Sequence, residues 1–453
     1  MSKRNFILLI IVLGIVAISI VGFLYFNQGT PTGEESTGTN FISHFNPFGT
    51  GKPATSSNDS NSPVDVSGYQ PPVDTQVPNS GFTKISSMPI AGFTLFMKER
   101  LKEIPPPTVV TDTTTTTSPA TTPKKTTKPT PPPTEFALAL RYVEKATGNI
   151  YQTFVDKISE RKFSGTLIPK VYDAYFGNSG QSVTMRYLKP DGKTIETFVG
   201  NLPKEVLGGD TTELSDIKGS FLPNDVKDLT TSPDNSKLFY LFINGTGDGE
   251  SIIGTTLNFG DSKKVQVFNS PFTEWLSQWP SSNTITLSTK PSANIPGYMY
   301  ALDLTKKSLI KVLGNINGLT TLTSPSGKSV LYADSSLALA LYHTDTRGAE
   351  LLGLKTLPEK CVWGKVNDVV YCAVPKLVET GEYPDAWYQG KVSFNDQFWK
   401  IDVKTGTTTL IFDPATLNTG EEVDATKLSM DDGEKYLFFI NKKDSYLWKL
   451  DLK

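Results

Sequence analysis

The chain has 453 residues, of which 38% are hydrophobic and 11% aromatic. The stretch of about 320 residues after position 134 is long enough to bury a substantial core. The formal net charge is −2 and the sequence pI is about 5.9, so nucleic-acid binding has no electrostatic support. The two histidines and two cysteines form no cluster with the spacing of a zinc site.

Residues 6–26 form an unbroken run of apolar and small side chains without a charge. About 20 such residues span the hydrocarbon core of a bilayer as a helix. Lys3 and Arg4 precede the run, and the first charges after it are acidic, so the positive-inside rule places residues 1–5 in the cytoplasm and the rest of the chain outside the cell membrane. The alternative is a cleaved signal peptide. The run exceeds the usual h-region and no small-x-small motif follows Asn27, which favours an uncleaved single-pass anchor.

Two biased segments follow the predicted anchor. Residues 27–80 are rich in Gly, Ser, Thr, Asn and Pro, lack apolar periodicity and are predicted to be a disordered tether. Residues 105–134 are almost entirely Thr and Pro, a composition that favours an extended, solvated chain. In an extracellular protein this second segment could carry O-linked sugar, and an unmodified linker is the alternative.

Residues 81–104, between these segments, are too apolar for a tether. They could anchor a Thr/Pro stalk, or they could belong to the folded domain with residues 105–134 as a surface insertion. The chain ends after a strand pattern at Trp448–Leu452, which leaves the last repeat without an outer strand. The alternation in Phe82–Ser86 suits that missing strand. We therefore favour the insertion hypothesis and predict one domain over residues 81–453.

A short phrase of aromatic, polar, apolar, Asp and apolar residues returns three times, with a period close to 49 residues; its copies are Tyr300–Leu304, Trp399–Val403 and Trp448–Leu452. Its alternation is typical of a strand that runs into a turn. A strand-based repeat of this length predicts a β-propeller.

A second signature precedes most copies of the phrase: a turn rich in Ser, Pro, Asp, Asn and Gly, then a strongly apolar strand. Ser232-Pro233-Asp234 and Trp399 to Gly406 are the best examples. The combination resembles the TolB-type or WD-like propeller repeat over roughly residues 136–453, although no unit has a complete Ser-Pro-Asp-Gly or a Trp-Asp dipeptide. The opening of the chain resembles anchored envelope propellers of bacteria whose function is uncharacterised. The resemblance implies the fold and a role as an interaction platform, and it transfers no catalytic residue.

The fold class that we predict is therefore all-β, a propeller of seven blades. The expected central strands are near 136–143, 181–188, 236–243, 284–289, 329–333, 369–374 and 435–440. Six blades is the alternative, if residues 82–155 form a partial blade or a cap.

The two cysteines are predicted to form a disulfide. If Gly364 and Val369 flank a four-residue loop, Cys361 and Cys372 stand directly opposite each other in one hairpin. Directly opposed residues lie at a separation that a disulfide tolerates, and an extracytoplasmic compartment permits the bond. Two buried free thiols are the alternative.

We find no catalytic constellation and expect no cofactor and no metal. His343 aligns with the repeated phrase through Tyr342-His343-Thr344-Asp345, so a repeat position explains it without catalysis. No Gly-x-Ser-x-Gly elbow is present. Residues 244–250 lack the ligand spacing of an EF-hand and are expected to form a hairpin turn.

The best candidate for a partner-binding surface is the loop at residues 379–398, which lengthens one blade beyond the period. It carries aromatic and polar side chains close together, namely Tyr383, Asp385, Trp387, Tyr388 and Gln389. Aromatic anchors beside polar groups suit contact with a protein or a glycan. The alternative is that the aromatic rings fold back and cap the blade.

These patterns predict a membrane-anchored extracytoplasmic propeller that binds an envelope protein or a cell-wall glycan without catalysis. The first alternative is an enzyme that acts on surface polysaccharide through carboxylates at the channel mouth. The second is a structural module held off the membrane by a stalk. Converging carboxylates would favour the enzyme, and an apolar or aromatic mouth would favour binding.

Overall fold

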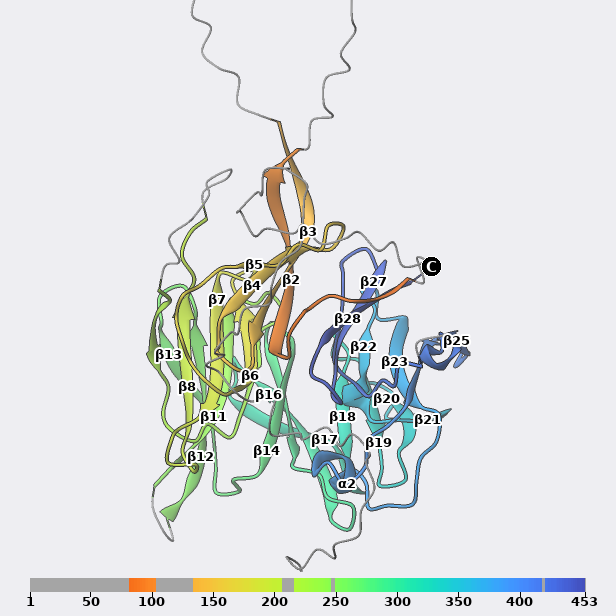
Figure 1. Cartoon of the computed structure of the whole chain (residues 1–453). Helices are drawn as coiled ribbons and strands as arrows, with labels where there is room; N and C mark the ends of the chain where they lie inside the picture. The colour runs from red at the N-terminus through yellow and green to blue at the C-terminus, as the bar shows by residue number, and fades with distance from the viewer. Residues whose placement is uncertain (1–80, 103–132, 206–215, 246–248, 418–419, 453) are drawn as a thin grey trace, which may run out of the picture. The chain divides into compact units, whose positions relative to one another are not determined.

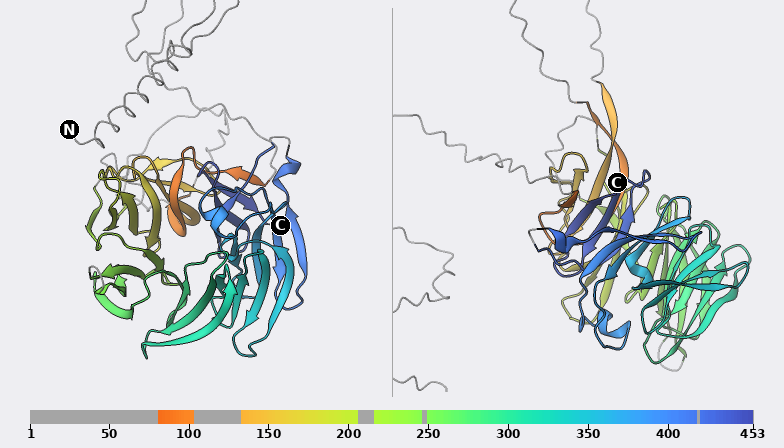
Figure 2. Two further views of the ribbon diagram at one scale, coloured as in Figure 1. Left: turned by 90° about the horizontal axis from the view of Figure 1, so that it is seen from below. Right: turned by 90° about the vertical axis from the view of Figure 1, so that its right-hand side faces the viewer.

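The computed structural model describes residues 81–102, 133–205, 216–245, 249–417 and 420–452. These residues form seven four-stranded antiparallel sheets arranged around a central axis (Figure 2). First strands of most successive sheets contact one another around this axis, which makes the first strands the inner strands of the seven propeller blades. The fold is therefore the predicted seven-bladed propeller, and the alternative of six blades is wrong.

The blades follow the chain in order, and Figure 1 labels many of their strands. Blade 1 contains β2 (Ile90–Leu101), β3 (Thr134–Glu144), β4 (Ile150–Phe154) and β5 (Arg161–Lys162). Blade 2 contains β6 (Val171–Gly177), β7 (Ser182–Leu188), β8 (Ile195–Asn201) and β9 (Lys218–Phe221). Blade 3 contains β10 (Asp228–Thr231), β11 (Lys237–Asn244), β12 (Ser251–Asn258) and β13 (Lys264–Ser270).

Blade 4 contains β14 (Trp275–Ser281), β15 (Thr284–Thr289), β16 (Pro296–Asp303) and β17 (Ser308–Asn317). Blade 5 contains β18 (Thr320–Thr323), β19 (Ser329–Ala333), β20 (Ala338–His343) and β21 (Ala349–Lys355). Blade 6 contains β22 (Cys361–Trp363), β23 (Val369–Pro375), β24 (Asp396–Asp402) and β25 (Thr408–Phe412). Blade 7 contains β26 (Ala425–Met430), β27 (Tyr436–Asn441), β28 (Leu447–Asp451) and β1 (Phe82–Lys84). Short helical turns are η3 (Pro358–Lys360), α2 (Asp385–Tyr388) and η4 (Pro414–Thr416).

Blade 7 is completed by a strand from the other end of the described chain, as the alternation in Phe82–Ser86 predicts. β1 pairs antiparallel with β28, with Phe82 opposite Leu450 and Lys84 opposite Trp448. The ring of Phe82 stacks on Trp448 at 4.8 Å and on Phe412 at 5.0 Å between ring centroids. This pairing covers the edge that β28 would otherwise expose and joins the two ends of the propeller.

The repeated sequence patterns occupy equivalent places in the blades. All seven predicted central strands are second strands, namely β3, β7, β11, β15, β19, β23 and β27. The three copies of the repeated phrase lie on the third strands β16, β24 and β28. Turns such as Ser324-Pro325-Ser326-Gly327 join first to second strands, where Gly327 has the positive φ of 72° that a residue without Cβ adopts readily.

The hydrophobic core lies between neighbouring blades. Leu331 and Leu341 of blade 5, for example, pack against Val370 and Ile401 of blade 6. The second strands are apolar on both faces because each blade is covered by a neighbour on either side. Gly92 of β2 marks a very close approach, since a Cβ there would lie 2.0 Å from the carbonyl oxygen of Ala174 in β6.

The first blade departs from the others because β2 and β3 form a long hairpin that projects beyond the propeller (Figure 1). Their backbone pairing continues to a hydrogen bond of 2.9 Å from Lys102 N to Pro133 O. Both ends of the Thr/Pro-rich segment therefore belong to one hairpin, which is the arrangement that the insertion hypothesis predicts.

The predicted anchor at 6–26, the predicted tether at 27–80 and nearly all of the Thr/Pro-rich segment at 105–134 lie outside the described residues. Within the part of the chain that the structure describes, no helix combines the length and hydropathy needed to span a bilayer.

Candidate binding sites

The predicted loop connects β23 to β24, at the end of blade 6 where second strands turn into third strands. It contains the single turn of α2 (Figure 1). Its side chains reach three other blades. Asp385 Oδ2 accepts a hydrogen bond of 2.6 Å from Ala293 N of blade 4, and Tyr383 packs with Leu337 of blade 5. The loop is thus part of the folded body and not a free appendage.

Trp387 is the centre of the loop's attachment to blade 7. Its side chain is only 4% exposed, and its Nε1 donates to both carboxylate oxygens of Asp424, at 3.1 and 3.0 Å. Lys442 Nζ donates to the Trp387 carbonyl and lies 3.8 Å from the indole centroid. Phe394 stacks on the same indole. These contacts give Trp387 a packing role.

Beneath the indole lies a fully buried ionic cluster. Lys360 Nζ is 2.5 Å from Asp424 Oδ1 and 2.8 Å from Asp396 Oδ2, and all three side chains are inaccessible to solvent. Lys360 also donates to the carbonyl of Ala425 at 2.9 Å. Such buried charges are tolerated only when they are paired and hydrogen-bonded. The cluster joins the connection before β22 to the connection before β26.

The two carboxyls of this cluster are affected in opposite directions. Burial raises the pKa of Asp396 to about 6, although Lys360 opposes the shift. Burial also acts against ionisation of Asp424, but the Lys360 ammonium and hydrogen bonds from Phe394 N and Trp387 outweigh it and lower the pKa of that carboxyl. The Lys360 ammonium therefore contacts two carboxyls whose pKa values are shifted in opposite directions.

The structure divides the five predicted site residues into two groups. Tyr383 and Trp387 are buried, and Asp385 is tied to blade 4, as the alternative of aromatic rings that cap the blade predicts. Tyr388, at 41% exposure, and Gln389 remain accessible. The Tyr388 hydroxyl donates to Glu359 Oε1. Of the five predicted residues, only Tyr388 and Gln389 can contact a partner without a rearrangement.

A pocket of about 670 Å³ lies at the opposite end of the propeller, where turns join first to second strands. We call it the mouth pocket, and this end of the propeller the mouth. It is bordered by β2, β6 and β26, and its apolar lining comes mainly from Phe93, Leu95, Phe96, Met97, Leu138, Phe176, Met430 and Tyr436. A bulge in β26 between Thr426 and Ser429, with Lys427 at a φ of 51°, interrupts the ladder beside it. This bulge could not be predicted from the sequence, because lysine is not a residue type that marks a bulge.

Two of the ionisable groups around this pocket, Asp431 and Lys427, are already used by the fold, whereas Asp432 and Lys435 are exposed. Asp431 accepts backbone hydrogen bonds from Gly433, Lys435 and Tyr436 in its own turn. Lys427 is paired with Asp173 and donates to the carbonyl of Ala91 at 2.9 Å. No group of three or more His, Cys, Asp or Glu side chains suited to a metal ion occurs among the described residues. The pocket lining is therefore mixed, with apolar and aromatic side chains beside polar and charged groups.

Two carboxylates lie deeper, on the inner strands of blades 2 and 3. Asp173 is flanked by Lys427 and Arg186, which lower its pKa despite burial, and Arg186 Nη1 lies 3.3 Å from Asp173 Oδ2. Burial raises the pKa of Asp228 to about 6, although Ser277 donates to this carboxylate from its hydroxyl at 2.7 Å and from its N–H. The pair differs in pKa, but each member also holds neighbouring blades together.

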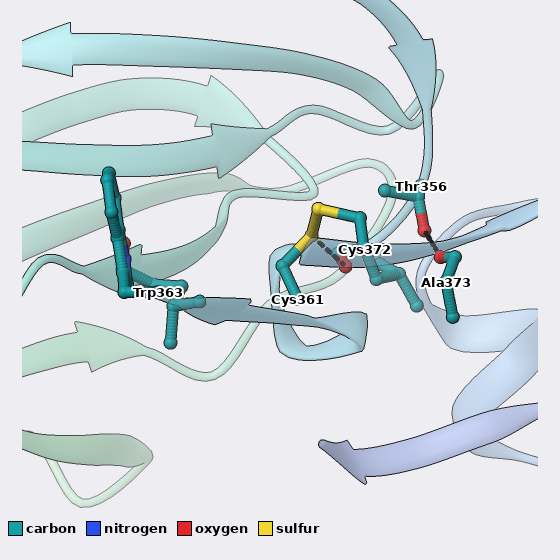
Figure 3. The surroundings of a disulfide bond; sticks show 7 residues. Thr356, Cys361, Trp363, Cys372 and Ala373 are labelled. Atoms are coloured by element: carbon teal, nitrogen blue, oxygen red, sulfur yellow. Dashed lines mark hydrogen bonds between the residues drawn. A yellow bond between two sulfur atoms is a disulfide. The ribbon is translucent and has the colours of Figure 1, made fainter. Parts of the chain in front are cut away.

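The predicted disulfide between Cys361 and Cys372 is confirmed (Figure 3). The two residues are direct partners of β22 and β23, and Gly364 N donates to Val369 O at 2.8 Å across the four-residue loop. Next to the bond, Thr356 Oγ1 donates to the carbonyl of Ala373 at 2.7 Å. The disulfide ties the shortest inner strand of the described blades to its neighbour.

His343 occupies a repeat position, but the predicted alignment was displaced by two residues. His343 pairs with Ser329, as Asp402 pairs with Val369 and Asp303 with Thr284. His343 thus takes the place of the Asp that starts the turn after the third strand, and not of the polar residue two positions earlier. Its Nε2 faces Glu350 Oε1 at 3.4 Å on the surface.

Comparisons with known proteins assign no family. No family model matches the chain, and no curated protein does. Among solved structures, an oligogalacturonate lyase from Vibrio parahaemolyticus is 7% identical with a TM-score of 0.46, over 70% of this chain and 86% of the other. The tricorn protease is 12% identical with a TM-score of 0.33, over 66% and 27%. The Cps50 (Swd1) propeller domain of Myceliophteria thermophila is 8% identical with a TM-score of 0.43, over 70% and 94%. These values transfer no activity, and the three proteins are a lyase, a protease and a β-propeller domain.

Proposed function

We propose that the protein is a non-enzymatic binding propeller of the cell envelope, anchored in the membrane by residues 6–26 and exposed outside the cytoplasm. The observation that carries the binding role is the mouth pocket, which brings apolar and aromatic side chains together with polar groups, among them the exposed Lys435. Pockets of this size with an apolar lining are the usual places of ligand and partner contact. The disulfide is compatible with an oxidising compartment.

The choice between the two ends of the propeller decides where the partner binds. The loop at 379–398 offers Tyr388 and Gln389 among its predicted residues, whereas the mouth pocket is a concave site lined by several apolar and aromatic side chains. We place the main site at the mouth and keep the exposed part of the loop as a second contact surface. The expected partner is an envelope protein or a cell-wall glycan, and the proposed role requires no cofactor.

Cross-linking and affinity capture of the intact protein in its native membrane test this proposal. A mouth variant, Met97→Asp with Lys435→Glu, changes only exposed side chains, and a loop variant, Tyr388→Ala with Gln389→Ala, does the same at the other end. We expect a specific partner that the mouth variant loses and the loop variant keeps. Loss in the loop variant alone would move the site to α2. The absence of any specific partner would contradict the platform function.

A second candidate function is an enzyme that acts on surface polysaccharide. One observation favours it: Asp173 and Asp228 lie near each other on inner strands with pKa values moved apart, which is how paired acids and bases are often arranged. Incubation of the protein with acidic and neutral cell-surface polysaccharides, followed by measurement of new reducing ends or unsaturated products, tests this function. Product formation that Asp228→Asn abolishes would support it.

A further inference from the structure

The inner strand of blade 1 has a long edge without a hydrogen-bonded neighbour in the described residues. β2 pairs only with β3, and it is twelve residues long, whereas the other inner strands have three to seven. From Phe93 to Leu101 the edge runs for roughly 30 Å at about 3.3 Å per residue. Its lower half borders the mouth pocket, and its upper half belongs to the projecting hairpin (Figure 1).

The hydrogen-bond pattern determines which residues serve this edge. Lys102 N bonds to Pro133 O, so this pair is hydrogen-bonded, and hydrogen-bonded pairs recur at every second residue of an antiparallel ladder. The register then directs the N–H and C=O groups of the even-numbered residues Thr94 to Arg100 toward β3. The odd-numbered residues direct theirs to the open edge; these are Phe93, Leu95, Met97, Glu99 and Leu101.

One face of the hairpin is apolar and exposed. Met97 lies opposite Leu138, and Glu99 lies opposite Phe136, so these side chains share a face. Met97 is 56% exposed and Phe136 is 68% exposed. The same face continues through Leu95 and Phe93 into the lining of the mouth pocket. A strand added to the edge would therefore place every second side chain against an apolar surface.

The other face carries cations around one carboxylate. Lys98 and Arg141 both pair with Glu205, and Arg100 lies on the same face with Glu135 and Asp156 as its partners. Lys98, Arg141 and Arg161 share the one carboxylate of Glu205, so positive charge is crowded there. Burial is the main cause that lowers the pKa of Lys98 to about 8, and the nearby charges of Arg141 and Arg161 add to it. Acidic side chains on an added strand would relieve that crowding.

A second copy of the chain is a poor occupant of the edge. In a two-fold antiparallel pairing, residues on the same face stand opposite each other, so the registers centred on Lys98, Glu99 or Arg100 each place that charge opposite its own copy. Charged residues on an edge strand act against such self-pairing. A register centred on Met97 avoids these repulsions, so the charges disfavour self-pairing in three registers, and the two cations that share Glu205 favour a partner chain with acidic side chains.

We propose that the edge of β2 from Phe93 to Leu101 receives an extended peptide of a partner protein as an additional strand, and that this peptide alternates apolar with acidic side chains. Backbone hydrogen bonds provide the affinity, while the pocket and the cationic face select the side chains. The inference rests on the proposed binding function and names the class of partner for the mouth.

The first test uses the full chain in detergent micelles and two fluorescent octapeptides, one alternating Val with Asp and the other Val with Lys. Fluorescence anisotropy should show saturable binding of the Val/Asp peptide and binding of the Val/Lys peptide weaker by about tenfold or more. Equal binding of both peptides, or binding of neither, would overturn the inference.

Residue-resolved hydrogen exchange then locates the peptide. The outward amides of Leu95, Met97 and Glu99 should exchange fast in the free protein and slow down when the Val/Asp peptide binds, whereas Lys98 and Arg100 are protected throughout. Protection that does not alternate would contradict strand addition.

A matched pair of variants separates the backbone from the side chain. Glu99→Pro removes an outward N–H without touching the ladder with β3, and Pro is tolerated at such edge positions. Glu99→Ala keeps the N–H. We expect the Pro variant to lose peptide binding by about tenfold or more and the Ala variant to retain it. Equal peptide binding by the Pro and Ala variants would refute strand addition at the edge of β2. Suppose that affinity capture in the membrane recovers a partner at the mouth pocket and that the Glu99→Pro variant binds the peptide as well as the parent protein does. Strand addition is then refuted, while the proposed binding function stands.

Discussion

The indole Nε1 of Trp387 donates to both oxygens of the Asp424 carboxylate, which itself pairs with Lys360 in the interior. This relationship connects the loop of blade 6 to the inner strand of blade 7 through charge and packing at once. It also explains why Trp387, the largest aromatic side chain of the loop, is a structural element of the propeller and is not accessible for recognition.

Replacement of Trp387 by Phe is therefore expected to destabilise the fold. The variant keeps an aromatic ring but leaves a hydrogen bond of a buried carboxylate unmade, at a cost of about 1–3 kcal/mol in the free energy of unfolding. Urea denaturation followed by circular dichroism measures the change. Gln389→Ala, on the exposed side of the same loop, should stay within about 0.5 kcal/mol of the parent. A Trp387→Phe variant as stable as Gln389→Ala would show that the indole hydrogen bond contributes little.

The pH dependence of the unfolding free energy should reveal the raised pKa of Asp396. Its pKa is raised by burial from the ordinary 3.8 to about 6, so between these values the folded state binds more protons than the unfolded state. The stabilising contribution of this carboxyl is fully present below about pH 4 and is lost as the pH rises through about 6. Asp396→Asn removes this titration and should flatten the fall in unfolding free energy across that interval.

Urea unfolding of both proteins at several pH values between 4 and 7 measures this difference. Asp424, with its lowered pKa, contributes in the opposite sense and only at lower pH, because its stabilisation is lost as the pH falls through that value. Asp228, whose pKa is also raised to about 6, is present in both proteins and cancels in the comparison. Parallel pH profiles for the two proteins would rule out a raised pKa at Asp396.

Local sequence patterns were sufficient for the seven second strands, because each combines a turn of defined residue types with an apolar run that is covered on both faces. The Cys361–Cys372 pairing was also readable, since one tight turn determines the register of the hairpin. The inner strands were harder, because β22 has three residues and little periodicity. The burial of Trp387 and the edge of β2 depend on contacts between distant blades, which no local pattern contains.

The disulfide is expected to contribute about 2–3 kcal/mol by restricting the unfolded chain, because it closes a short loop. A double variant, Cys361→Ala with Cys372→Ala, should lose that amount in urea denaturation, and the parent protein under a reducing agent should lose a similar amount. Thiol trapping in intact cells gives a separate readout of location. Free thiols in the freshly trapped native protein would argue against the extracytoplasmic placement that we propose.

The largest loss of stability that we predict concerns the closure of the ring by β1. Phe82 is buried against Trp448 and Phe412, so Phe82→Ala leaves a cavity between blades 6 and 7 and is expected to cost about 3–5 kcal/mol. Thr83, on the same strand but facing outward, provides the control, and Thr83→Ala should change stability by less than about 1 kcal/mol. Hydrogen exchange should show where the energy is lost: amides of β28 lose protection in Phe82→Ala before those of β11 in blade 3 do. A uniform loss of protection over all blades would instead mean that the propeller unfolds as one cooperative unit, with the closing strand as one contributor among many.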